Sequence, residues 1–133
     1  MSRRIIRHPS PLPMPFSRAT QAGGFLFLSG QVPMDAAGQV VRGDIRAQTE
    51  AVFDRITETL ALARCTLHDV VRVTVWLSDL ALFADFNEVY AARFGKALPA
   101  RSTVQARLAL DVDVEIEMQA LLPDRRPGPV SEA

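Results

Sequence analysis

The alternation of strand-like and helix-like segments constrains how this chain can fold more than any other feature. Residues 44–64 and 79–94 carry apolar side chains at helical spacing, and each segment leads from one β-type segment into another. Between them, residues 70–77 are rich in β-branched side chains and give the strongest strand signal. Because a helix that joins two strands of one sheet favours parallel strands, the pattern predicts an α+β domain with a partly parallel sheet.

Both predicted helices have recognisable ends. Asp44 is placed to cap the first helix, and either Ser78 or Asp79 is placed to cap the second. Gly95 is expected to end the second helix. Together with the strands, these helices give the predicted order β-β-α-β-α-β-β.

The remaining strands are shorter and less distinct. Residues 25–28 (FLFL) are interpreted as a buried strand, and residues 18–21 are a candidate hairpin partner across Gly23 and Gly24. Two further strands are expected at residues 102–108 and 112–122. The 133 residues fit a single domain, 1–133, with an extended lead-in over 1–15 and a flexible tail over 123–133.

Two helices on one face of a sheet leave the other face uncovered. The last predicted strand is apolar on both sides, through Met118, Leu121 and Leu122. In a chain this short, the simplest cover for the second face is another copy of the chain. The pattern therefore predicts an oligomer.

Composition narrows the choice of partners. The 15 basic and 15 acidic side chains give a net charge of zero, which disfavours nucleic acid and anionic membrane surfaces as partners. One cysteine, Cys65, and two histidines, His8 and His68, make a metal site unexpected. The N-terminus lacks a signal-peptide pattern and no apolar stretch is long enough to span a bilayer, so we expect a cytoplasmic protein.

Four short motifs contain candidate catalytic or ligand-binding residues. Residues 27–33 contain Ser-Gly-Gln, where Gly30 would let a ligand approach the main chain. Residues 99–104 place Arg101 at the start of a strand, and a guanidinium suits bidentate capture of a carboxylate. Residues 114–117 place Glu115 and Glu117 on one strand face, where a carboxylate beside an apolar pocket can move protons. Residues 85–90 place Asn87 within an apolar helical stripe. Taken alone, each motif favours an ordinary structural role over a functional one.

Taken together and in this order, the motifs resemble the RidA family, also called the YjgF family. The resemblance covers nearly the whole body of the chain, from Phe16 to Glu117. It is carried by LSGQVP at residues 28–33, GDIRAQT at 43–49, VTVWLSD at 73–79, FNEVY at 86–90, PARSTV at 99–104 and VEIE at 114–117.

The resemblance implies a fold, an assembly and an activity. Family members are chorismate-mutase-like α+β domains, with a mixed β-sheet and two helices on one face. Three of them form a homotrimer with a barrel-like core and sites at the subunit interfaces. The family's deaminases hydrolyse reactive 2-imino acids and their enamine tautomers, such as 2-aminoacrylate, to 2-keto acids and ammonia without a cofactor. The implied ligand is therefore a small carboxylate-bearing imine or enamine.

The resemblance also assigns roles to residues. Arg101 matches the residue that grips the substrate carboxylate, and Glu115, in preference to Glu117, matches the residue that positions water. Asn87, Gly30 and the main chain of Thr103 match groups that line the substrate site. Phe16 is a departure, because deaminating members commonly have tyrosine there.

Phe16 leaves alternatives open. The missing hydroxyl favours either a pathway-specific relative, such as an aminomuconate-type deaminase, or a non-catalytic trimer that binds small carboxylates. Arg101 together with Glu115 favours the two enzymatic readings. The physiological substrate is not readable from the sequence.

Overall fold

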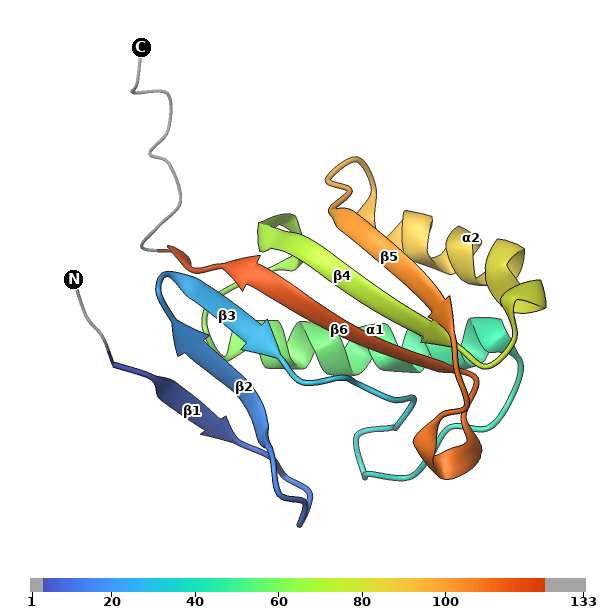
Figure 1. Ribbon diagram of the computed structural model, residues 1–133, viewed down its shortest axis with the longest axis horizontal. Coiled ribbons are helices and arrows are strands. Elements are labelled where there is room, and N and C mark those ends of the chain that lie inside the picture. Colours follow the sequence, from blue (N-terminus) through green and yellow to red (C-terminus); the bar gives the residue numbers. More distant parts are fainter. Residues whose placement is uncertain (1–3, 124–133) are drawn as a thin grey trace.

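The computed structural model describes residues 4–123. Two helices, α1 (Ile45–Ala61) and α2 (Phe83–Phe94), lie among six strands (Figure 1). The strands are β1 (Ile6–Pro9), β2 (Ser17–Ala22), β3 (Phe25–Leu28), β4 (Val70–Leu77), β5 (Ala100–Gln105) and β6 (Val114–Leu121). From β2 onward the order is β-β-α-β-α-β-β, as predicted from the sequence.

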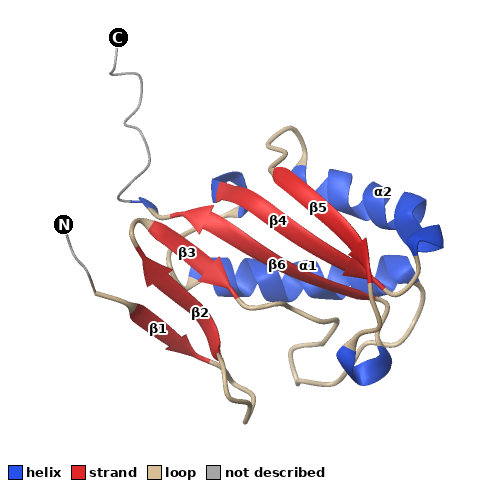
Figure 2. Cartoon of the chain, viewed as in Figure 1, coloured by secondary structure: helices blue, strands red, loops and turns tan. Residues whose placement is uncertain are grey.

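The strands form one mixed sheet in the order β1-β2-β3-β6-β4-β5. The neighbouring strands β4 and β5 are parallel, and the other neighbouring pairs within residues 4–123 are antiparallel. Both helices cover the same face of this sheet (Figure 2). The predicted fold class, a YjgF-like α+β domain with two helices on one face, is confirmed.

The hydrophobic core lies between the sheet and the helices. Large side chains from both helices are fully buried in it, including Phe53 and Ile56 of α1 and Phe86 of α2. Phe53 packs edge-on against Tyr90 and Phe94, with ring centroids 5.9 and 5.7 Å apart, which ties α1 to α2. Cys65 is buried at the edge of the same core, as expected of a small apolar group.

The opposite face of the sheet carries exposed apolar side chains. Strand β3 was interpreted as a fully buried strand, but only its alternate residues are buried. Phe25 and Phe27 are 36% and 38% exposed on the uncovered face, where Val104 of β5 is 45% exposed. The interpretation was wrong because a continuous apolar run cannot distinguish a strand covered on both faces from one covered on a single face. We call this uncovered surface the open face.

Several element boundaries differ from the predictions. Residues 1–15 were expected to be a lead-in, but Ile6–Pro9 forms edge strand β1, paired with β2. Pro9 ends this strand, and proline is tolerated at that position because an edge strand has unpaired backbone groups. Strand β5 begins at Ala100 rather than 102 and ends at Gln105 rather than 108. Residues 109–111 form a 3-10 turn before β6 begins at Val114.

The predicted helix ends agree with the structure more closely than the predicted strand ends do. The Asp44 carboxylate accepts a hydrogen bond from the Ala47 backbone N–H at 2.9 Å and caps α1. The predicted cap of the second helix was wrong in part: Asp79 caps a 3-10 turn, Leu80–Leu82, and α2 itself begins only at Phe83, after Leu82, without a side-chain cap. Gly95 ends α2 with a positive φ of 64°. Most of the predicted tail, 124–133, lies outside the described residues, and within residues 4–123 no helix is long and apolar enough to cross a membrane.

Candidate active site

Arg101 lies near the start of edge strand β5 and points toward the helices. Its Cα partner on β4 is Val73, whose side chain is fully buried beneath the helices. Side chains on neighbouring strands at paired positions share a face, so Arg101 and Thr103 both face helix α2. The guanidinium donates through Nε to the Thr103 hydroxyl at 2.8 Å and through Nη2 to Asn87 Oδ1 at 2.7 Å.

Three aromatic rings of α2 surround the same guanidinium. Its central carbon lies 4.6 Å from the Tyr90 ring centroid, 5.3 Å from that of Phe86 and 5.4 Å from that of Phe83. Rings at these distances attract the cation and fix its position. Within residues 4–123, no carboxylate forms an ion pair with Arg101. The charge is therefore held in place without being neutralised.

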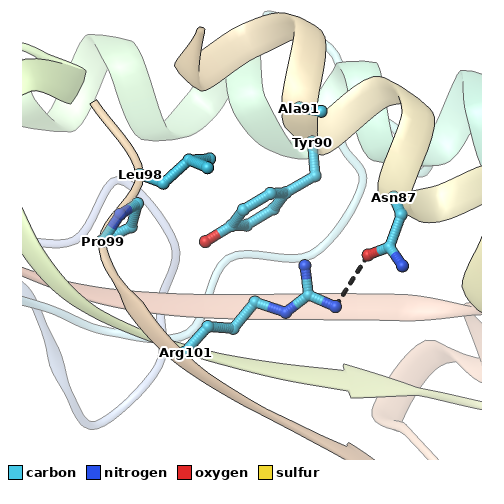
Figure 3. Close-up of a pocket in the computed structure, with 6 residues that line it drawn as sticks. All are labelled: Asn87, Tyr90, Ala91, Leu98, Pro99 and Arg101. Carbon is cyan, nitrogen blue, oxygen red and sulfur yellow. Dashed lines mark hydrogen bonds between the residues drawn. The ribbon is translucent and has the colours of Figure 1, made fainter. Parts of the chain in front are cut away.

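An open cavity of about 400 Å³ lies beside this guanidinium (Figure 3). Its lining combines polar groups of α2 and β5 with apolar groups of the segment that joins them: Asn87, Tyr90, Ala91, Leu98, Pro99 and Arg101. We call it the Arg101 pocket. Its mixture of a fixed cation, an amide and apolar walls suits a small organic anion.

A second group of candidate residues gathers around Glu115 on β6. Glu115 is half-buried, and its side chain lies against Gly30, where any β-carbon would collide with the Glu115 carboxylate. Gln31 holds Gly30 in place, because its backbone exchanges hydrogen bonds of 2.8 and 3.0 Å with Ile116. A larger residue at position 30 would therefore displace the end of the Glu115 side chain from its present position.

The environment of Glu115 favours its protonated form. Burial raises the pKa of the Glu115 carboxyl, and the negative charge of Glu117 on the same strand face raises the pKa further. Glu117 itself lines a second hollow, of about 340 Å³, together with Ser17 of β2, Phe27 of β3 and Ser29, which directly follows β3. A raised pKa is the property expected of a carboxyl group that handles protons.

Phe16 lies at the entrance to strand β2, next to Ser17. The Ser29 hydroxyl donates to the Ser17 carbonyl oxygen at 2.6 Å, which connects this corner to the loop that carries Gly30. The Phe16 side chain is 46% exposed. Phe16 is not among the residues that line the Arg101 pocket.

The predicted site residues consequently form two groups on opposite faces of the sheet. Glu115 pairs with Trp76 of β4, whereas Arg101 pairs with Val73, three positions earlier in the same strand. Odd separations along a strand place side chains on opposite faces. Arg101, Asn87 and Thr103 face the helices, and Glu115 faces the open side.

Tyr90 is a site residue that the sequence analysis did not single out. It was counted among the apolar residues of the helical stripe, yet it lines the Arg101 pocket and stacks on the guanidinium. The available signal was its spacing, because Tyr90 follows Asn87 by three residues and so shares its helix face. As for metal ligands, no three His, Cys, Asp or Glu side chains in the described part of the chain gather as a metal site would require.

The class that this fold defines is the YjgF-like α+β domain. The chain belongs to the YjgF/RidA family: residues 8–122 match the family model described as Endoribonuclease L-PSP. A RutC family protein of Pyrococcus horikoshii is 46% identical over 120 residues, covering 88% of this chain and 95% of that protein.

Solved structures agree with this membership. The crystal structure of yeast Mmf1 superposes with a TM-score of 0.86 at 35% identity, covering 90% of this chain and 99% of that one. RidA from an Antarctic Psychrobacter superposes with a TM-score of 0.79 at 34% identity, covering 87% and 94% of the two chains. The names of the family model and of these relatives do not agree on one function.

Proposed function

We propose that the protein is a deaminase that hydrolyses 2-imino acids and their enamine tautomers to 2-keto acids and ammonia. The single observation that carries the proposal is the Arg101 guanidinium. It is fixed by Asn87, Thr103 and three aromatic rings, it faces an open pocket, and it has no acidic partner within residues 4–123. An unneutralised guanidinium in such a pocket suits an acid group on the ligand.

The remaining donors of Arg101 match a carboxylate. A guanidinium has five N–H donors, and the two hydrogen bonds to Thr103 and Asn87 use Nε and Nη2. Neither of them uses Nη1. A substrate carboxylate can therefore bind along the Nη1–Nη2 edge without displacing the groups that hold the side chain.

The reaction needs little beyond this grip and a positioned water molecule. Water adds to the imine carbon, a proton passes to the nitrogen, and ammonia leaves as the carbon–nitrogen bond breaks, which yields the 2-keto acid. Glu115 is the group proposed to orient the water and to carry the proton, because burial and the charge of Glu117 raise the pKa of its carboxyl. Holding the two reactants in line supplies the rest of the rate enhancement.

The opposite orientations of Arg101 and Glu115 require a second protomer. Within one chain the sheet itself separates the two groups, so a small substrate cannot touch both. The open face carries exposed Phe25, Phe27 and Val104, the type of surface that another copy buries. A homotrimer in which Arg101 of one protomer meets Glu115 of the next would satisfy both requirements, and this is the assembly we propose.

The description of the family model names an endoribonuclease, a different chemistry. A surface that grips the phosphodiester backbone needs a basic surplus, and this chain has a net charge of zero. No specific observation in the site favours RNA cleavage. Incubation with a single-stranded RNA therefore serves as a negative control, and cleavage lost on changing Arg101 would overturn the assignment.

The proposal is tested with imines generated in situ by an amino-acid oxidase, where semicarbazide trapping competes with deamination. We expect the wild type to suppress semicarbazone formation and Arg101→Ala to lose this activity by at least about a hundredfold, since a charged hydrogen-bonded pair is removed. Arg7→Ala is the matched control, because Arg7 is exposed on edge strand β1 at the far end of the sheet. Full activity in Arg101→Ala would refute the role of this residue. A wild type that binds 2-keto acids without accelerating deamination would identify a carboxylate-binding protein instead.

A further inference from the structure

The Arg101 pocket contains a hydroxyl group whose hydrogen-bonding capacity is unused. Tyr90 is 4% exposed, and its hydroxyl oxygen is buried without a hydrogen-bond partner among the described residues. Buried hydroxyl groups are normally paired, because an unpaired one loses its bonds to water and gains nothing in exchange. A native protein that retains such a group calls for a physical explanation.

The ring of Tyr90 already has a structural role that does not need the hydroxyl. It packs against Phe53, Phe86 and Phe94, and its face lies against the Arg101 guanidinium. Phenylalanine would make all these contacts equally well. The ring contacts therefore do not account for the presence of a hydroxyl group at position 90.

The hydroxyl lies at the wall of the pocket that also contains the guanidinium. Figure 3 shows it beside the Arg101 side chain and facing the Leu98–Pro99 segment, with which it lines the cavity. Leu98 is 61% exposed, so its side chain can turn aside without disturbing the core. A ligand held by Arg101 then has access to the hydroxyl.

The hydroxyl is a donor under ordinary conditions. Burial raises the pKa of Tyr90, and the positive charge and the N–H donors of Arg101 oppose this rise without reversing it. The group therefore keeps its proton at neutral pH. A guanidinium can only donate hydrogen bonds, so the hydroxyl proton of Tyr90 still has no acceptor among the described residues. A ligand atom that pairs with it must be an acceptor, and a carboxylate oxygen on Arg101 is the nearest one that the proposed function supplies.

The geometry points to Tyr90 as a further substrate-binding residue, whose hydroxyl donates a hydrogen bond to the acid group held by Arg101. This inference rests on the proposed function, because it assumes that the ligand carries a carboxylate. The ligand carboxylate would then accept hydrogen bonds from the neutral Tyr90 hydroxyl as well as from the charged Arg101 guanidinium. Tyr90 lies on helix α2, one turn from Asn87.

The first test is Tyr90→Phe, with 2-oxobutanoate as the probe and binding measured by isothermal titration calorimetry on the full chain. A hydrogen bond to a charged acceptor is worth a roughly tenfold to hundredfold change in affinity, so we expect the dissociation constant to rise by that factor. The thermal midpoint should stay the same or rise, because the substitution removes an unpaired buried group. Phe94→Leu is the matched control, because Phe94 packs against the Tyr90 ring and is not one of the three rings around the Arg101 guanidinium, and it should leave the affinity unchanged.

The second test needs no substitution at position 90. Tyr90 is the single tyrosine of the chain, so labelling tyrosine with carbon-13 at Cζ gives one NMR signal that reports this hydroxyl. We expect the signal to shift when 2-oxobutanoate is added and to stay fixed when butanone, which lacks the carboxylate, is added. The same carboxylate-dependent shift should be absent in Arg101→Ala.

The outcomes separate this inference from the proposed function. Unchanged affinity in Tyr90→Phe, or a lowered thermal midpoint with unchanged affinity, overturns the role of the hydroxyl while deamination by the wild type still stands. An unmoved NMR signal on saturation with 2-oxobutanoate also overturns it. A wild type that neither binds 2-oxobutanoate nor deaminates imines refutes the proposed function and this inference together.

Discussion

Glu115 shows how the surroundings of one residue set its chemistry. The side chain is half-buried and shares a strand face with Glu117, and burial has the larger effect in raising its pKa. A carboxyl with a raised pKa keeps its proton up to a higher pH than an ordinary glutamate. If Glu115 acts as a base in deamination, activity must fall as the pH drops through this raised value.

The contribution of Glu117 can be isolated by removing its charge. In Glu117→Gln the pKa of Glu115 should decrease, so the acidic limb of the pH–rate profile should move to lower pH. The measurement is kcat/KM for imine hydrolysis across the acidic range. Glu58→Gln on helix α1 is the control and should leave the limb in place. An acidic limb that does not move in Glu117→Gln would mean that another group controls it.

Gly30 illustrates a residue whose importance was predicted for a different reason. The sequence analysis proposed that a glycine there lets a ligand approach the main chain. The structure adds a second reason, because a β-carbon at position 30 would displace the end of the Glu115 side chain. No pattern in the sequence indicates that residues 30 and 115 are neighbours.

At the scale of elements, the helix ends were readable because a cap depends on local sequence. Asp44, Asp79 and Gly95 all act within a few residues of their own positions. The ends of β5 and β6 were less readable, since a strand ends where its neighbour stops pairing with it. The N-terminal strand β1 was missed for the same reason, as it depends on β2 for all of its pairing.

The Asp44 cap gives a prediction about stability. Asp44→Ala should lower the free energy of unfolding by about 1 kcal/mol, because the Ala47 N–H loses its acceptor. Asp44→Asn should leave the free energy of unfolding nearly unchanged, since asparagine caps helices equally well. Urea denaturation at a fixed protein concentration measures both variants, and the fixed concentration is needed if the protein associates. Equal losses in the two variants would indicate that the charge, rather than the cap, stabilises the helix.

At the scale of the whole molecule, the separation of the two groups of site residues is the dominant fact. Arg101 faces the helices and Glu115 faces the open side, so the sheet of one chain separates these two candidate groups. The exposed aromatic side chains of β3 lie on the same side as Glu115. This arrangement makes activity a property of the proposed assembly.

Mixing two inactive variants tests this directly. Arg101→Ala and Glu115→Gln should each be inactive alone. If they are coexpressed and associate at random in a cyclic assembly, about a quarter of the sites should pair an intact arginine with an intact glutamate and regain activity. Size-exclusion chromatography with light scattering establishes the assembly, and each variant coexpressed with itself is the control. A fully inactive mixture from a verified trimer would show that both residues of each site come from one chain.

The sequence by itself determined the features that depend on neighbours along the chain. The two helices, their caps, the central strand β4 and the identity of the motifs around Arg101 and Glu115 all follow from local periodicity and residue type. Only the tertiary structure decided which face of the sheet each motif occupies, that Glu115 lies against Gly30, and that Tyr90 stacks on Arg101. The physical reason is that strand register and helix docking depend on contacts between residues far apart in sequence, and these contacts leave no local signal.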